Sequence, residues 1–165
     1  MSAYAARRAQ IRSGDLLAWR GRSPGAWIVR HWTGSEISHT GVAMWIAGRL
    51  FAIEARPGLG VTMRLLSAAL PCEWAGLWID PADWKRAEEF ALRALGRNYS
   101  WLDAILAGLG LPPRQWDKYQ CAEFVAGCYR RAGVLPFRRR ALQRLIPDEI
   151  QRRVMTLGAP VQLLV

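Results

Sequence analysis

The stretch HTGVAMWIAGRLFAIEA, residues 39 to 55, contains two β-forming segments separated by a two-residue turn. The segments 39–46 and 50–55 are rich in residues of high β propensity, and Ala47-Gly48 lies between them. Glycine readily adopts the positive φ that a two-residue hairpin loop requires, whereas alanine is a mediocre first residue for such a loop. The stretch therefore predicts an antiparallel β-hairpin in the front half of the chain.

The expected hairpin also determines which side chains share one face of the sheet. With a two-residue loop, Ile46 pairs with Arg49. Glu54 then lies opposite Gly41 and diagonal to His39, on the same face. Diagonal neighbours are about 7–8 Å apart, within reach of a glutamate bonding an imidazole, and Gly41 has no side chain to block it. A register slip of one residue would place Glu54 on the other face.

Strands are expected mainly in the front half of the chain and helices in the back half. Further strands are expected at 16–19, 61–65 and 73–79, with an edge strand at 161–165 and turns at 13–15 and 57–60. Helices are expected from Ser23-Pro24 through His31, from Pro81 to Leu95 between an Asp80 N-cap and Gly96, from Ser100 through Leu106, and over 118–132. This grouping predicts an α+β fold rather than an alternating parallel one.

Length and composition indicate one globular domain, residues 1–165. The chain is 52% hydrophobic and 22% charged, which is typical of a packed protein and not of a disordered one. The most apolar run, 101–111, is too short to span a membrane and contains Asp103. No secretory signal is expected, because no apolar stretch follows the N-terminal arginines. We therefore expect a protein that is cytoplasmic at synthesis, with export by another route left open.

The charge is strongly basic, with 23 Lys and Arg against 13 Asp and Glu. One interpretation is arginine scattered over the surface; the other is peripheral contact with an anionic surface. The densest cluster, partly offset by two acidic residues, comprises Arg138, Arg139, Arg140, Arg144, Arg152 and Arg153. Aromatic residues are not interleaved there and no nucleic-acid-binding motif is present, so a nucleic-acid partner is not expected.

The chain has three cysteines, Cys72, Cys121 and Cys128. An odd number without an export signal argues against a disulfide framework. The spacing of Cys121 and Cys128, with only two histidines in the chain, argues against a zinc site, so no metal is expected. Cys128 is expected in the core and Cys72 at a loop or strand end.

Cys121 is distinctive because it lies near the start of the helix expected over 118–132. The unpaired N–H groups and the dipole of a helix N-terminus stabilise a thiolate. The dipole contributes at most ~2 kcal/mol, which lowers a thiol pKa by roughly 1.5 units from its reference of about 8.5. A partner base is therefore needed to make Cys121 a strong nucleophile.

Only two histidines are available as that base. His31 falls within an expected helix, where a structural or surface role is favoured, whereas His39 opens a strand. A site made of Cys121, His39 and Glu54 is one interpretation of these residues, and three unrelated core and surface residues is the other.

Five segments, in this order, resemble the circularly permuted branch of the papain-like NlpC-type cysteine hydrolases, closest to YiiX-like proteins and related to the lecithin:retinol-acyltransferase type. The segments are SGDLLAW (13–19), ISHTGVAMW (37–45), FAIEARPGLGVTMRLLS (51–67), LGRNYSW (95–101) and YQCAEFVAGCYRRAG (119–133). No segment is specific alone, but the ordered set is. The histidine strand precedes the cysteine helix, which is the permuted order. The resemblance implies a permuted papain-like fold, with a small antiparallel sheet or partial barrel packed against helices.

The resemblance also implies site roles: Cys121 as nucleophile, His39 as general base, Glu54 as the residue that orients His39, and Tyr99 as a substrate-binding hydroxyl near the site. The backbone N–H of Cys121 would contribute to an oxyanion site. This chain departs from the family pattern at Ala122, where serine is common. The role of Gln120 stays unassigned.

The function expected from these residues is a thiol hydrolase that cleaves an amide through a thioester, without a cofactor. The substrate would be a cell-wall (peptidoglycan) peptide or an amide-linked lipid. Two alternatives remain open: an acyltransferase or lipase of the lecithin:retinol-acyltransferase type, and a non-catalytic structural or binding module that kept the fold.

Overall fold

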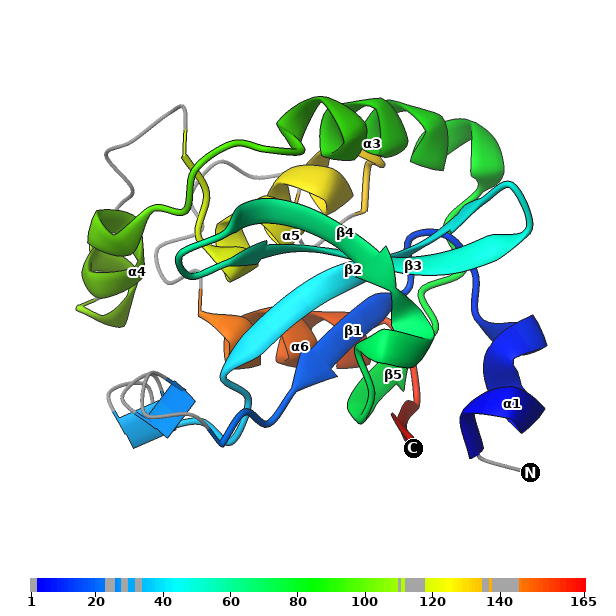
Figure 1. Cartoon of the computed structure of the whole chain (residues 1–165), viewed down its shortest axis with the longest axis horizontal. Helices are drawn as coiled ribbons and strands as arrows, with labels where there is room; N and C mark the ends of the chain where they lie inside the picture. Colours follow the sequence, from blue (N-terminus) through cyan, green and yellow to red (C-terminus); the bar gives the residue numbers. More distant parts are fainter. Residues whose placement is uncertain are drawn as a thin grey trace.

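The structure is a computed structural model that describes residues 3–22, 26–27, 30–31, 34–109, 111, 118–134, 137 and 146–165. Within them an open six-stranded antiparallel sheet packs with helices, so the expected α+β class is confirmed (Figure 1). The strand order is β4-β3-β2-β1-β5-β6. The strands are β1 (Leu16–Trp19), β2 (His39–Ile46), β3 (Arg49–Arg56), β4 (Gly60–Leu65), β5 (Cys72–Ala75) and β6 (Val161–Leu164).

The α-helices named in these parts of the chain are α1 (Ala3–Arg7), α3 (Pro81–Ala94), α4 (Trp101–Gly108), α5 (Cys121–Arg131) and α6 (Pro147–Met155). Short 3₁₀ turns lie at η1 (Arg8–Gln10) and η2 (Leu66–Ala68). Helix α5 packs on strands β2 and β3, and α3 packs on α5. Helix α6 contacts α5, β1 and β2. The long helix α3 therefore reaches the sheet mainly through α5 (Figure 1).

The central hairpin has the predicted register. Strands β2 and β3 pair Ile46 with Arg49 and Val42 with Ile53. The two loop residues, Ala47 and Gly48, have φ of 47° and 73°, the positive values that a type I′ turn requires. Ala47 accepts a strained conformation because the two-residue loop keeps the register of both strands.

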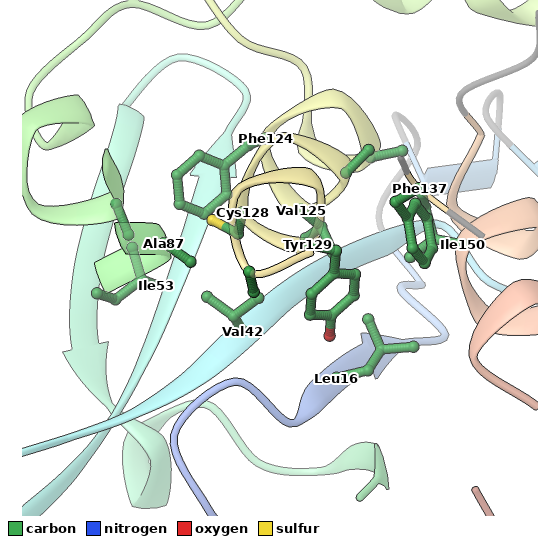
Figure 2. Close-up of a cluster of buried hydrophobic side chains, with 14 of the residues drawn as sticks. Leu16, Val42, Ile53, Ala87, Phe124, Val125, Cys128, Tyr129, Phe137 and Ile150 are labelled. Atoms are coloured by element: carbon green, nitrogen blue, oxygen red, sulfur yellow. The ribbon is translucent and has the colours of Figure 1, made fainter. Parts of the chain in front are cut away.

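Alternate residues of the strands belong to two separate clusters of apolar side chains, because successive side chains of a strand point to opposite faces of the sheet. Leu16 faces the helix-side core, whereas Leu17 faces a second core on the other side of the sheet. Figure 2 shows the helix-side core, where Tyr129 of α5 points toward Leu16 and Phe137 lies beside Ile150. The second core includes Ile11, Trp19, Ala43, Ala52, Leu66 and Trp74.

The helix expected at Pro81–Leu95 is confirmed as α3. Asp80 is its N-cap, because the Asp80 carboxylate accepts a hydrogen bond from the N–H of Ala82 at 2.8 Å. The helix ends at Ala94, and Gly96 then has φ of 79°, as a terminating glycine does. The predicted edge strand at the C-terminal end is confirmed as β6.

Two expectations on secondary structure need correction, and a third lies partly outside the described residues. The strand expected at 73–79 is β5, Cys72–Ala75, because the N–H of Leu77 donates to Asp15 and Trp78 has a positive φ of 52°. The helix expected over 118–132 begins only at Cys121, since Gln120 is its extended N-cap. The helix start at Ser23-Pro24 lies outside the described residues, although 26–27 and 30–31 are helical.

Sequence reasoning also missed α1 and α6. In α6 the arginines pair along the helix: Arg152 Nε lies 2.8 Å from Asp148, and Arg153 Nε lies 2.7 Å from Glu149. These two members of the expected basic cluster therefore have acidic partners. The other four, Arg138, Arg139, Arg140 and Arg144, lie outside the described residues.

Candidate active site

The hairpin brings His39 and Glu54 into direct contact. Glu54 Oε2 lies 2.6 Å from His39 Nε2, as the predicted register allows. The Glu54 side chain is fully buried, and the His39 side chain is 17% exposed. A Cβ built on Gly41 would lie 3.0 Å from the Cβ of Glu54, so glycine leaves the space through which this carboxylate reaches the imidazole. The ring of His39 also lies 5.4 Å from the ring of Trp19.

Helix α5 supplies the sulfur. Cys121 is its first residue, and the Cys121 sulfur is hydrogen-bonded to the imidazole of His39. Since Nε2 of His39 faces Glu54, the nitrogen that bonds the sulfur is Nδ1. The backbone N–H groups of Thr40 and Ala122 also donate to the sulfur. The N-terminal end of α5 therefore lies against the first residues of β2.

The electrostatics of the site favour an ion pair between Cys121 and His39. Burial alone raises the pKa of the Cys121 thiol, but the His39 charge and the hydrogen bonds from His39, Thr40 and Ala122 outweigh it and lower this pKa. Burial alone lowers the pKa of His39, but the Cys121 thiolate and the Glu54 carboxylate raise it to about 9. Both shifts favour the thiolate and imidazolium form of the pair over the neutral form.

Arg64 is a member of the cluster that sequence reasoning missed. Its Nε lies 2.5 Å from Glu54 Oε1, so the two carboxylate oxygens serve two different partners. Burial raises the pKa of Glu54, but His39 and Arg64 together lower it below its ordinary value. The register of β4 against β3 explains its position: Thr62 pairs with Glu54, and Arg64 is the diagonal neighbour on the same face.

Gln120, left unassigned from the sequence, is the N-cap of α5. Its Oε1 accepts from the N–H of Ala122 at 3.0 Å and lies 3.8 Å from the Cys121 sulfur. Glu123 accepts a hydrogen bond from the N–H of Gln120, which completes a reciprocal capping box. Two side chains thus stabilise the first turn of the helix that carries Cys121.

Tyr99 lies near the same sulfur. A parallel bridge joins Tyr99 to Tyr119, two residues before Cys121, and α4 and α5 begin just after it. Burial, followed by the negative charge of Cys121, raises the pKa of the Tyr99 phenol, so Tyr99 is protonated and neutral. The Tyr99 ring packs edge-on against Trp101 at 5.2 Å. The structure therefore places Tyr99 near Cys121, and its substrate-binding role stays a prediction.

The surroundings of the remaining cysteines and of the other histidine differ from those of Cys121. Cys128 is completely buried in the helix-side core, and burial raises its pKa. Cys72 is the first residue of β5, at a strand end as predicted, and burial raises its pKa to about 12. The imidazole of His31 is stacked on Trp27 at 5.1 Å in an exposed segment.

Asp15, in the segment SGDLLAW, has a structural role. Its buried carboxylate accepts hydrogen bonds from Trp74 Nε1 at 2.7 Å, from the N–H of Arg12 at 2.8 Å and from the N–H of Leu77 at 3.0 Å. These bonds tie the start of β1 to the loop after β5, and they satisfy a group that burial would otherwise leave unpaired.

The described parts of the chain contain neither a metal-binding cluster nor a helix that could span a membrane. No three or more His, Cys, Asp or Glu side chains are grouped there so as to hold a metal ion. None of the helices in those parts combines the length and the apolar character that a transmembrane helix requires.

Comparison with known proteins gives a match in fold but not in sequence family. No family model and no curated protein matches the chain. Among solved structures, the crystal structure of the metalloprotein YiiX from Escherichia coli O157:H7 matches with a TM-score of 0.59 at 21% sequence identity. The match covers 74% of this chain and 67% of YiiX. Over that part of its length, the fold of the chain is similar to the fold of YiiX.

Proposed function

We propose that this protein is a cysteine hydrolase of the amidase or peptidase type, in which Cys121 is the nucleophile, His39 the general acid and base, and Glu54 the positioning residue. The observation that carries the proposal is the position of His39 between the sulfur of Cys121 and the carboxylate of Glu54. A nucleophile bonded to a base, with the base oriented by a third group, is the arrangement used for nucleophilic catalysis.

The proposed acylation begins from the thiolate. The Cys121 sulfur attacks the carbonyl carbon of an amide, and a C–S bond forms as the carbonyl π pair moves to oxygen. Collapse of that tetrahedral intermediate breaks the C–N bond, and His39 gives its proton to the leaving nitrogen. The products of this half-reaction are a free amine and a thioester on Cys121.

Deacylation reverses the role of His39. The neutral imidazole takes a proton from water as the water oxygen attacks the thioester carbonyl. The C–S bond then breaks, a carboxylic acid leaves, and the thiolate and imidazolium are restored. Glu54 holds the ring orientation and stabilises its charge in both steps, and Arg64 holds Glu54.

The negative oxygen of each tetrahedral intermediate needs nearby donors. The first N–H groups of an α-helix have no partner within the helix, and the N–H of Cys121 is the first of α5. We assign this group to the oxyanion site. The Tyr99 phenol, protonated at neutral pH, is a second polar group on the substrate side.

The proposed substrate class is an amide in a cell-wall (peptidoglycan) peptide or an amide-linked lipid. Cys121 is only 4% exposed and the His39 side chain 17%, so the reactive pair presents a small opening to solvent. This favours a slender acyl group at the sulfur over a bulky one.

A direct test is the formation of an acyl-enzyme with p-nitrophenyl acetate. Absorbance measures the release of p-nitrophenolate, and intact-protein mass spectrometry measures the adduct. The proposal predicts a burst of one p-nitrophenolate per active protein and an acetyl adduct mapped to Cys121, which Cys121→Ala abolishes. Cys128→Ala is the matched control and should keep the burst, provided that its circular dichroism shows a folded chain. Failure of the folded wild-type protein to form the adduct would contradict the proposal.

The same adduct distinguishes hydrolysis from acyl transfer. Release of acetate into water, unaffected by added alcohols or amines, supports a hydrolase. Transfer to an added alcohol or amine in preference to water identifies an acyltransferase and overturns the hydrolase assignment. A folded protein whose Cys121 reacts no faster than a free thiol is a non-catalytic module.

A further inference from the structure

A pocket lies on the surface formed by α3 and α5. Its volume is about 310 Å³, at the lower end of the range for small-molecule pockets. The pocket is lined by Arg86, Glu89, Phe90, Arg93, Ala94, Arg97, Tyr119 and Arg131. The lining contains none of the three proposed catalytic-site residues.

Arginines of α3 and of the residues after it line this pocket. Arg86 lies four residues before Phe90 and Arg93 three residues after it, so these side chains share one stripe along α3. Arg97 follows the C-terminal end of the helix and lines the same pocket. This stripe is distinct from the buried face of α3, which carries Trp84, Ala87 and Ala91. The stripe faces the pocket, where it meets Arg131 from α5.

Arg131 is held in position. Its guanidinium carbon lies 3.7 Å from the centre of the Phe90 ring, and its Nη1 donates to the carbonyl oxygen of Gly127 at 3.1 Å. Stacking on an aromatic face leaves the remaining N–H groups of a guanidinium free of the ring plane. The Phe90 ring in turn packs edge-on against Tyr119 at 5.6 Å. This part of the pocket is therefore built from packed aromatic side chains.

The charges in the pocket are not balanced by the protein. Four arginines face one glutamate, which leaves a formal net charge of +3 on the lining. Glu89 lies 3.5 Å from Arg93, and Arg86 pairs with Asp83 at 3.2 Å, both as exposed pairs of small energetic value. For Arg97 and Arg131, the described residues provide no acidic partner. Burial and the neighbouring Arg130 lower the pKa of Arg131, as expected of unrelieved positive charge.

We propose that this pocket binds a small molecule carrying two or more phosphate charges, such as a diphosphate or a phosphomonoester. A phosphate group presents several acceptor oxygens and up to two charges, which match the planar, five-donor guanidinium. A carboxylate carries a single charge and leaves most of the positive lining unpaired. Phosphate on a free metabolite and phosphate on a lipid headgroup share this chemistry.

The experiment is titration calorimetry of the full chain with inorganic pyrophosphate and with inorganic phosphate. Pyrophosphate should bind more tightly than phosphate. The substitutions Arg97→Gln and Arg131→Gln should each lower the affinity for pyrophosphate by about tenfold or more. Arg49→Gln is the matched control, because Arg49 is an exposed arginine at the hairpin turn, outside the pocket. It removes the same overall charge and should change the affinity by less than about twofold.

Three outcomes would overturn the proposal. These are no measurable pyrophosphate binding at low salt, equal binding by wild type and Arg97→Gln, or equal loss in Arg97→Gln and Arg49→Gln. Because Arg131 packs on Phe90, circular dichroism should accompany Arg131→Gln; if that variant is unfolded, Arg97→Gln alone decides. Arg97→Lys, which keeps the charge, should retain part of the affinity.

A second arm separates the two sources of phosphate. Phosphatidylcholine vesicles with and without phosphatidic acid are sedimented with wild type, Arg97→Gln and Arg49→Gln. Co-sedimentation that needs phosphatidic acid and Arg97, together with weak pyrophosphate binding, identifies a lipid headgroup. Tight pyrophosphate binding without co-sedimentation identifies a soluble ligand.

Discussion

Glu54 Oε2 lies 2.6 Å from His39 Nε2, across a hairpin whose two-residue loop fixes which residues face one another. The contact is buried and its carboxylate has a second partner in Arg64. The hairpin therefore both holds the imidazole ring in one orientation and raises its basicity, which are the two properties that a base beside a thiol requires.

Glu54→Gln tests the contribution of the carboxylate charge. Glutamine keeps the size of the side chain but removes the charge that raises the pKa of His39, so this pKa falls from about 9. Since one pKa unit corresponds to about a factor of ten, alkylation of Cys121 by iodoacetamide at neutral pH should slow by about tenfold or more. Glu88→Gln, at a half-buried position of α3 outside the site, is the control and should leave the rate unchanged. Equal rates in the two variants would disprove a role for the Glu54 charge.

The pH dependence of labelling distinguishes the three cysteines. Because the pKa of Cys121 is lowered, its thiolate persists below the ordinary thiol range, and labelling should decline only as the pH falls through that lowered pKa. Cys72, with a pKa of about 12, and Cys128, whose pKa is raised, should stay unlabelled at neutral pH. Peptide mapping after a short iodoacetamide pulse measures this. Labelling of Cys121 that begins only above about pH 8 would contradict the ion pair.

The rate of hydrolysis should decline at high pH, whereas the rate of Cys121 labelling should not. As the pH rises through about 9, His39 loses the proton that it would give to the leaving amine. The rate of amide hydrolysis should therefore fall above that pH, whereas alkylation of the thiolate should continue. A hydrolysis rate that keeps rising well above pH 9 would exclude His39 as the acid.

Arg64→Met tests the outer member of the cluster through acid stability. The pKa of Glu54 is lowered in the folded chain, so its ionised form stabilises the fold above its ordinary pKa of about 4.5, and this stabilisation is lost as the pH falls through the folded value. Removing Arg64 should reduce the free energy of unfolding near neutral pH by about 1–3 kcal/mol. The difference from wild type should shrink under acidic conditions. Urea unfolding at several pH values, with Arg49→Met as control, measures it; a difference that does not change with pH would refute the assignment.

Gly41→Ala tests the space that lets Glu54 reach His39. The added Cβ would lie 2.8 Å from the carbonyl oxygen of Ile53 and 3.0 Å from the Cβ of Glu54. We expect a loss of stability of about 1–3 kcal/mol and slower labelling of Cys121. In Gly48→Ala the new Cβ meets nothing within 4 Å, and only the positive φ of 73° is strained. That control should lose about 1–2 kcal/mol and keep its labelling rate.

The hairpin register could be predicted because it depends on local chemistry. A two-residue loop at Ala47-Gly48 sets every cross-strand pair of β2 and β3, and the pairing of Ile46 with Arg49 confirms it. The same holds for α3, whose Asp80 N-cap and terminating Gly96 are neighbours of the helix in sequence. Helix α6 was missed, although Pro147 at its first turn and its acidic first-turn residues are local signals as well.

Other features depended on contacts between distant parts of the chain. The extent of β5 was overestimated because its end is fixed by Asp15, more than sixty residues away, which captures the N–H of Leu77. Arg64 was missed because the sequence analysis had no register for β4 against β3. The role of Gln120 was open because glutamine is an uncommon N-cap.

The sequence by itself determined the α+β class, the hairpin register and the placing of His39 and Glu54 on one face, since each follows from periodicity and turn chemistry over a few residues. The tertiary structure alone decided that the sulfur of Cys121 meets His39, eighty-two positions earlier in the chain. That meeting requires α5 to pack on β2 with its N-terminal end at the start of the strand. Such packing is driven by burial of apolar faces, which has no fixed spacing in a sequence.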